Sequence, residues 1–273
     1  MVARRNAKVI KILVYTATVI TFGVLLFLIG YILVKGIPHL SFSLFELEYT
    51  SENVSMFPAI INTLVMTVLS LVIAIPFGLF TAIYLVEYAK RDNRLVGIIR
   101  LTAETLAGIP SIVYGLFGLL FFVTYMGWGF SILAGSATLS IMILPLIMRT
   151  TEEALQSVPA SLREASFGLG AGKLRTIFRI VVPSAMPGIL AGIILAIGRI
   201  VGETAALIYT AGTVAKLPQG LFSSGRTLSV HMYTLSSEGF HTDEAYATAV
   251  VLLIIVLMIN TISAIIAKRV TRT

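Results

Sequence analysis

Residues 161–183 read SLREASFGLGAGKLRTIFRIVVP, a basic segment with three glycines that separates two apolar stretches of the chain. Ser161 and Glu164 have the Ser-x-x-Glu spacing of a capping box, which predicts a helix that starts at Leu162. Gly170 favours a left-handed backbone, which ends such a helix. The segment therefore begins with a short helix of about two turns.

A second helix is predicted directly after this turn. Its apolar residues recur at the spacing of one helix face and have basic neighbours. These apolar residues are Leu174, Ile177, Phe178 and Val181. Pro183 then leads into the next apolar stretch. We expect this short helix to lie across a membrane surface.

The rest of the chain is strongly apolar. Of its 273 residues, 57% are hydrophobic and 12% are charged, and the mean hydropathy is +0.96. Soluble domains carry about 25% charged residues, so this composition excludes a water-soluble enzyme, a disordered chain and a coiled coil. The absence of cysteine from the sequence excludes disulfides, thiolate zinc sites and cysteine nucleophiles.

Six windows are apolar over the roughly 20 residues that a bilayer-spanning helix needs. They lie near residues 13–34, 58–86, 104–126, 130–148, 184–212 and 246–267. Six spans predict an all-α membrane protein with both termini on one side. The first window is expected to be an anchor, because its apolar run exceeds the roughly 7–15 residues of a signal peptide.

The basic residues indicate which side that is. Sixteen of the 20 Lys and Arg residues fall in the two terminal segments and in the loops 87–103 and 149–183, and only three fall in the alternating segments. By the positive-inside rule, both termini are predicted to be cytoplasmic in a multi-pass protein of the cell (plasma or inner) membrane. This distribution explains the net charge of +7 without a nucleic-acid partner.

The segment 164–183 resembles the cytoplasmic signature of binding-protein-dependent ABC importer permeases: Glu-Ala-Ala, three residues, Gly, nine residues, Ile-x-Leu-Pro. Glu164, Gly170 and Pro183 keep that register, and Ser166 and Val182 are small departures in volume. A plain helical hairpin between spans has no need of these spacings. The resemblance implies the type I (MetI-like) permease fold, with a coupling helix that docks in a groove of an ATPase subunit. The residues that it implicates in ATPase coupling are Ser161, Leu162, Arg163, Glu164, Ala165, Gly170 and Pro183.

Two parts of the chain are expected on this basis. Residues 1–57 would form an N-terminal anchor helix and an outside loop. Residues 58–273 would form the permease core, with the cytoplasmic coupling loop at 149–183.

Arg199 and Glu203 lie near the middle of the fifth apolar window, where each charge costs about 2.5–3.5 kcal/mol on insertion scales. Their i, i+4 spacing would place both on one helix face. One interpretation is a permanent ion pair that only locks helices together. The other is that Arg199 offers its bidentate guanidinium to an anion such as phosphate, with Glu203 holding Arg199 between transport events.

Residues 198–205, GRIVGETA, resemble the Arg-x-x-Gly-Glu-Thr-Ala segment of phosphate importer permeases, and residues 105–118 resemble their third core span. Residues 63–88 and 251–262 favour the PstA-type subunit over its PstC-type paralogue. The resemblance implies ATP-driven phosphate import, with a substrate pathway that includes Arg199, Glu203 and Thr204. It also implies a PstC-type second permease, a pair of PstB-type ATPase subunits and a PstS-type extracytoplasmic phosphate-binding protein as partners, in addition to membrane lipid.

Two alternatives stay open: a permease of the same fold for another oxyanion, such as sulfate or molybdate, and an ATP-independent secondary transporter. The glycines before Lys173 lack the spacing of an ATP-binding phosphate loop, so the ATPase site is expected on another subunit. The sequence contains no catalytic or metal-ligating constellation. It therefore predicts a transport subunit that is not an enzyme and has no cofactor.

Overall fold

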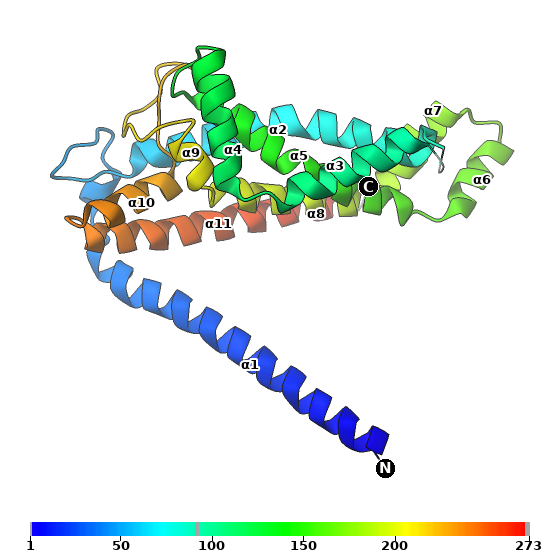
Figure 1. Ribbon diagram of the computed structural model, residues 1–273, viewed down its shortest axis with the longest axis horizontal. Coiled ribbons are helices and arrows are strands. Elements are labelled where there is room, and N and C mark those ends of the chain that lie inside the picture. The colour runs from blue at the N-terminus through cyan, green and yellow to red at the C-terminus, as the bar shows by residue number, and fades with distance from the viewer. Residues whose placement is uncertain (1, 91–92, 271–273) are drawn as a thin grey trace.

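A computed structural model describes residues 2–90 and 93–270, and the regular structure within them is helical throughout (Figure 1). Within these residues, five helices are long and apolar enough to cross a membrane, and a sixth span is counted if one bent helix pair is a single crossing. The five are α1 (Val2–Gly36), α2 (Phe57–Ile83), α5 (Ile132–Gln156), the helix from α7 (Lys173–Thr176) through α8 (Val182–Val201), and α11 (Thr242–Val270). The predicted all-α membrane architecture is confirmed.

The third predicted span is not one straight helix. It is divided into α3 (Arg94–Gly108) and α4 (Ser111–Gly118), which meet at an angle of 102°. The break lies at Ile109, whose backbone is extended because the following proline, Pro110, disfavours a helical conformation there. A π-helical turn, Leu119–Tyr125, lengthens α4.

The fifth predicted span, residues 184–212, is also wrong at its C-terminal end. Helix α8 ends at Val201, and a separate one-turn helix, α9 (Ala205–Ile208), follows after a break. The following polar stretch, which lies outside the predicted spans, contains the helix α10 (Leu228–Glu238). Sequence hydropathy does not detect α10, because the signals for this helix are the capping residues at its two ends. The Thr227 side chain accepts a hydrogen bond from the Val230 amide, and Gly239 adopts a left-handed φ of 75°.

Helix α5 is the centre of the molecule. In its most apolar window 67% of the residues are buried, whereas none are buried in that of α1. Small polar residues allow α2 and α5 to approach closely: Ser140 donates to the Ser70 carbonyl at 3.1 Å, and Ser70 donates to the Ser136 carbonyl at 3.2 Å. Helix α8 packs on another side of α5, where a Cβ on Gly192 would clash with the Thr150 side chain.

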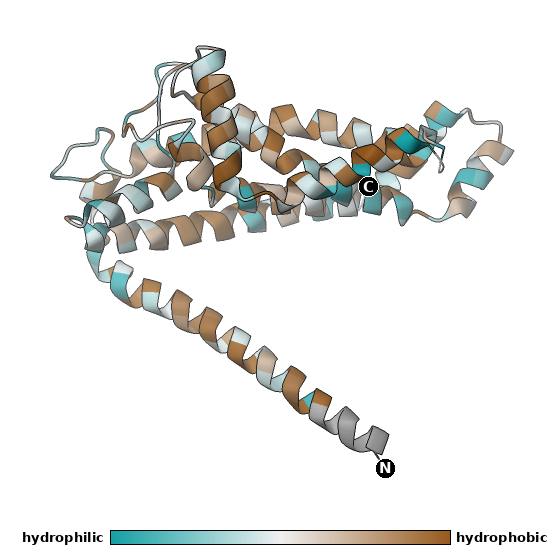
Figure 2. Cartoon of the chain, in the orientation of Figure 1, coloured by the Kyte–Doolittle hydropathy of each residue, from teal (hydrophilic) through white to brown (hydrophobic). Residues whose placement is uncertain are grey.

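Helix α1 projects away from the other helices (Figure 1). It meets α11 only near its C-terminal end, where the Tyr31 and Tyr246 rings form an edge-to-face pair with centroids 5.9 Å apart. Figure 2 shows that most of its exposed surface is apolar, as expected for a helix surrounded by lipid or by a partner subunit.

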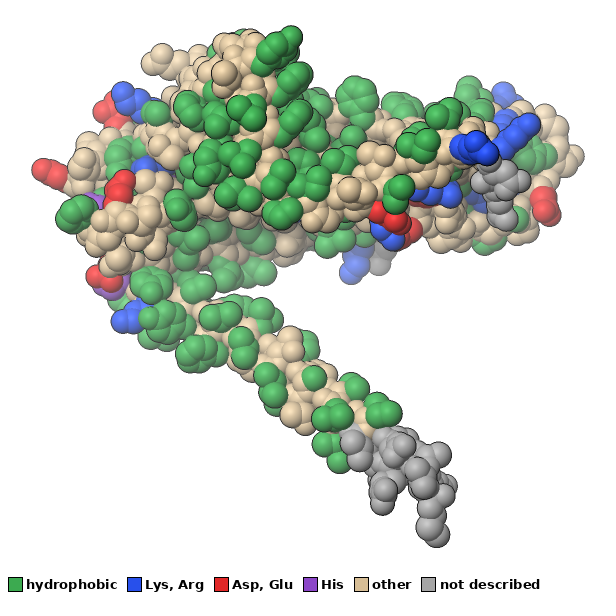
Figure 3. Space-filling model, viewed as in Figure 1, with side chains coloured by type: hydrophobic (Ala, Val, Ile, Leu, Met, Phe, Trp, Pro, Cys, Tyr) green, Lys and Arg blue, Asp and Glu red, His purple; other side chains and the backbone are tan. Residues whose placement is uncertain are grey.

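The two ends of the bundle differ in charge. Lys and Arg side chains gather at the end formed by α6 (Ala160–Gly168) and α7, as Figure 3 shows. The opposite end consists of the turns between α1 and α2, the loop after α9, and α10. Thus two of the segments with the predicted excess of basic residues, 87–103 and 149–183, contribute to the same end.

Candidate functional site

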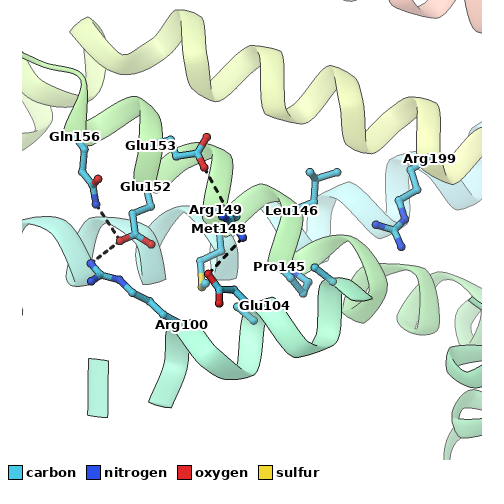
Figure 4. Close-up of a pocket in the computed structure, with 12 residues that line it drawn as sticks. Arg100, Glu104, Pro145, Leu146, Met148, Arg149, Glu152, Glu153, Gln156 and Arg199 are labelled. Carbon is cyan, nitrogen blue, oxygen red and sulfur yellow. Dashed lines mark hydrogen bonds and ion pairs between the residues drawn. The ribbon is translucent and has the colours of Figure 1, made fainter. Parts of the chain in front are cut away.

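A pocket of about 340 Å³ lies between α3, α5 and α8, and we refer to it as the central pocket (Figure 4). Its wall holds an equal number of cationic and anionic side chains amid apolar ones. The charged residues are Arg100, Glu104, Arg149, Glu152, Glu153 and Arg199. Only Arg199 among them belongs to the predicted substrate pathway.

At the end of the central pocket nearest α6, the charges are tightly paired. Arg100 forms an ion pair with Glu152, and Gln156 donates a hydrogen bond of 3.0 Å to the same carboxylate oxygen of Glu152. The Glu152 side chain is only 11% exposed. Buried charges of this kind are stable when paired and hydrogen-bonded, so this group fixes α3 against α5.

Arg149 is held more loosely in the middle of the pocket. Its Nη1 atom lies 3.5 Å from Glu104, and its Nε atom lies 3.4 Å from Glu153. Both distances exceed the roughly 2.7–2.9 Å of a strong charge-assisted hydrogen bond. The Arg149 side chain is 57% exposed. Its guanidinium is therefore free to exchange one partner for another.

The predicted Arg199–Glu203 pair does not form. Because α8 ends at Val201, Glu203 lies beyond the helix and no longer shares a helix face with Arg199. The Glu203 side chain instead accepts a hydrogen bond from the Ala206 amide at 3.1 Å, at the start of α9. In Figure 4 Arg199 points into the central pocket, and no ion pair of its guanidinium is found within residues 10–90 and 93–269.

Thr204, the third predicted pathway residue, faces a different cavity. This second cavity, of about 430 Å³, lies beside α10 and α11 and includes Ile32 of α1 and Tyr246. The structure therefore does not bring Arg199, Glu203 and Thr204 together. The sequence window 184–212 was interpreted as one span because apolar residues continue on both sides of the break, and Gly202, which follows the end of α8, was its local signal.

The predicted coupling segment begins with helix α6, but its capping box does not form. Helix α6 begins at Ala160, with Pro159 as its N-cap and no side-chain cap. Ser161 therefore lies within the first turn, where its hydroxyl cannot cap the helix as an N-cap hydroxyl does. Ser161, Glu164 and Ala165 are exposed.

The predicted end of α6 is confirmed. Gly170 has a φ of +81°, its amide donates to the Phe167 carbonyl at 2.9 Å, and the Ala171 amide donates to the Ser166 carbonyl at 3.1 Å. These two bonds form a Schellman motif, which satisfies carbonyls at the end of the helix. The Ser166 and Thr176 hydroxyls, 2.8 Å apart, then attach α6 to α7.

The predicted second helix is not a separate surface helix. Helix α7 passes through a π-helical turn, Ile177–Val181, directly into α8, so residues 173–201 form one continuous helical segment. Pro183, which has no amide hydrogen to donate, lies just after this π-helical turn, where the regular α-helical hydrogen-bond pattern is already interrupted. Of the predicted stripe, Ile177 and Val181 are buried against the bundle, while Leu174 and Phe178 are exposed. The helix therefore continues the bundle instead of lying apart from it.

Arg163, predicted to couple to an ATPase, turns inward instead of outward. It donates to the Glu87 carboxylate at 2.8 and 3.0 Å and to the backbone carbonyls of Leu155 and Val158 at 2.9 and 2.8 Å. The two side chains are 20% and 10% exposed. This pair anchors α6 to the end of α2. The sequence analysis did not identify Glu87 as a functional residue. The one signal that could have found it is its position, as a carboxylate at the basic end of the second predicted span.

The outer surface of α6 carries large apolar side chains among polar ones. Leu162 and Phe167 are exposed on it, and Leu169 at its end is 89% exposed. Together with exposed Glu164 and Ala165, these residues form a surface that can contact another protein.

The comparisons with known proteins agree with this architecture. Residues 74–273 match the family model described as binding-protein-dependent transport system inner membrane component. The chain is 36% identical to the probable ABC transporter permease protein YqgI of Bacillus subtilis, with 87% of each chain covered. It is 38% identical to the phosphate transport system permease protein PstA 1 of Mycobacterium tuberculosis, over 80% of this chain and 72% of that one.

Solved structures show the same fold. A bacterial ABC transporter that imports alginate has a chain that matches with a TM-score of 0.69 at 19% identity, covering 93% of each chain. A chain of the MetNI methionine ABC transporter matches with a TM-score of 0.61 at 21% identity, covering 79% of this chain and 94% of that one.

These findings make the chain a multi-pass membrane transport component, not an enzyme, and imply partners that supply ATP hydrolysis and substrate binding. The chain belongs to the family of binding-protein-dependent transport system inner membrane components.

Proposed function

We propose that the chain is the PstA-type permease subunit of an ATP-driven phosphate importer. The relatives named as phosphate permeases support the substrate class. The observation that carries the proposal is Arg199, a guanidinium without an ion-pair partner in the described part of the chain, in a pocket whose other arginines are paired with carboxylates.

An arginine is suited to this task because its planar fork binds two oxygens of a phosphate at once. Arg199 is partly buried on α8, where a bound anion would gain more from the charge than it would in bulk water. Glu203 would contribute indirectly, by holding the start of α9 through the Ala206 amide. Thr204, the residue before α9, would act on the same helix break between α8 and α9 from the α9 side.

The chain would form half of the translocation pathway. Its proposed partners are a PstC-type second permease, a dimer of PstB-type ATPase subunits and a PstS-type phosphate-binding protein. The basic end with α6 would face the cytoplasm, as the positive-inside rule predicts, with both termini on that side. The exposed apolar residues Leu162, Phe167 and Leu169 would then meet the ATPase, and the Arg163–Glu87 pair would transmit movement of α6 to α2.

The test is uptake of radiolabelled phosphate into cells that depend on this importer, normalised to the assembled complex in the membrane. Because Glu203 does not pair with Arg199, Arg199→Ala leaves no carboxylate without its partner. We expect it to fold and assemble but to lose uptake, and Arg199→Lys to retain only part of it. The matched control is Arg94→Ala, which removes an exposed arginine from α3.

Normal uptake by Arg199→Ala would place the anion pathway elsewhere. Competition assays identify the substrate: a tenfold excess of unlabelled phosphate should strongly reduce the uptake of label, and an equal excess of sulfate or molybdate should not. If sulfate or molybdate competed as well as phosphate, the chain would serve another oxyanion. ATP-dependent uptake by this chain reconstituted alone would contradict the proposed need for partners.

A further inference from the structure

Three arginines line the central pocket in succession. In Figure 4 Arg199 lies at one end, Arg149 in the middle, and Arg100 at the other end. The helix directions agree with this order, because α8 reaches Arg199 at its end farthest from α6, whereas α5 approaches α6 as it continues beyond Arg149. An anion that leaves Arg199 toward the basic end therefore passes Arg149.

We propose that Arg149 is a second oxyanion-binding residue, which receives the anion from Arg199, and that Glu104 and Glu153 are the carboxylates that the anion displaces. The inference rests on the proposed function and adds a site within the same pocket. Its chemistry is that of a tetrahedral phosphate oxyanion that exchanges with a carboxylate on a guanidinium, with no covalent step.

The geometry distinguishes Arg149 from Arg100. Arg100 is bound to a buried carboxylate that Gln156 also holds, so an anion would have to disrupt a closed group. Arg149 has two carboxylates at 3.4 and 3.5 Å, with Glu104 and Glu153 60% and 67% exposed. Exposed pairs of this kind are weak, and they can open at little cost.

Weak pairing suits a transfer site. A pathway must bind its ion firmly enough to admit it and loosely enough to release it, which several adjacent sites achieve better than one. The two carboxylates compete with the oxyanion for Arg149 and prevent it from remaining bound. They also lie on two helices, α3 and α5, so a change in the angle between these helices would alter the competition.

The experiment measures binding of radiolabelled inorganic phosphate to the nucleotide-free complex, purified in detergent, with the double variant Glu104→Gln, Glu153→Gln. Each exposed pair is worth up to a factor of about five, so we expect phosphate affinity to rise about tenfold. Adding Arg149→Gln should return the affinity to within about twofold of the wild-type value. Adding Arg199→Gln instead should preserve most of the gain.

A matched control separates this effect from a general change of charge. The double variant Glu48→Gln, Glu52→Gln removes two exposed carboxylates from the turns at the opposite end and should leave phosphate affinity unchanged. In uptake assays, Arg149→Gln should lower the maximal rate several-fold without changing half-saturation, and Arg149→Lys should restore part of the rate.

The outcomes separate the two proposals. If Arg199→Ala abolishes uptake but the double Gln variant binds phosphate as the wild type does, the transfer site is refuted and the proposed function stands. A gain that persists after Arg149→Gln also refutes it. If the wild-type complex transports no phosphate, the proposed function itself fails.

A lipid phosphate could satisfy the same guanidinium, so the binding assay is repeated in vesicles of phosphatidylcholine with and without phosphatidylglycerol. The gain in inorganic phosphate binding should appear in both. If the double variant only retained phosphatidylglycerol, the site would be a lipid site and the proposal would be overturned.

Discussion

The two ends of the molecule each enclose an arginine, but they stabilise it differently. At the α6 end, Arg163 donates to Glu87 and to two backbone carbonyls. At the opposite end, Arg226 is 4% exposed and lies over the Tyr49 ring, with its Cζ atom 4.6 Å from the centroid. No ion pair of Arg226 is found within the described residues, and its Nε and Nη2 atoms have no hydrogen-bond partner there.

The difference indicates how each end responds to force. Charge pairing at the α6 end is directional and joins α6 to the end of α2 through two defined side chains. At the other end the arginine packs on an aromatic face, and His231 near it is uncharged at neutral pH, because burial, and secondarily Arg226, lowers the pKa of His231 to about 3. The α6 end is therefore suited to transmit movement, and the opposite end to stay fixed.

The largest effect is expected from breaking the charge pair. Glu87→Ala leaves Arg163 partly buried without its anion, which should cost about 3–5 kcal/mol and release α6. Thermal unfolding of the purified complex and co-purification of the ATPase measure this loss. Glu104→Ala is the matched control, because it removes a carboxylate from an exposed pair worth at most about 1 kcal/mol. Equal losses in both variants would show that the Arg163–Glu87 pair is not a special anchor.

A smaller effect is expected at the opposite end. Tyr49→Leu removes the ring beneath Arg226 and should cost about 2 kcal/mol, the size of a desolvated cation–π contact. Tyr49→Phe keeps the ring and should remain near wild-type stability in the same thermal unfolding assay. If Tyr49→Phe is as unstable as Tyr49→Leu, the hydroxyl and not the ring supports Arg226.

Gly170 tests whether the end of α6 must have a defined geometry. Gly170→Val places a β-branched residue at a φ of +81°, which costs about 1–2 kcal/mol of backbone strain, although a Cβ there would meet no other atom. We expect the chain to insert normally but to bind the ATPase less well and to couple ATP use poorly to transport. Gly168→Ala, also in open space but without a left-handed backbone, should behave as the wild type. Normal uptake and normal ATPase binding by Gly170→Val would contradict the coupling assignment.

The smallest effect concerns pH. Because the pKa of His231 is lower in the folded state than the usual 6.5, the unfolded state binds more protons below that pH, and stability falls as pH decreases toward 3. Between about pH 7.5 and about pH 5.5 the loss should be about 1 kcal/mol. The variant His231→Leu should lose less stability over this range. Parallel melting temperatures of variant and wild type against pH would rule out His231 as the source.

Much of the fold follows from the sequence alone. Long apolar windows determine where helices can cross a bilayer, because a buried backbone must satisfy its hydrogen bonds within the segment. The left-handed end of α6 also follows locally, since Gly170 has no Cβ to oppose a positive φ. The basic residues that gather around α6 and α7 were likewise evident as part of an uneven distribution of Lys and Arg.

Only the tertiary structure decided how the charges are paired. Spacing alone placed Arg199 beside Glu203, but the end of α8 at Val201 separates them and gives Glu203 to the Ala206 amide. Arg163 and Glu87 are 76 residues apart, and no local pattern relates them. Hydropathy and spacing report on neighbours along the chain, whereas the partner of a charge is set by which helices pack together. The charged residues of the central pocket come together because α3, α5 and α8 pack against one another.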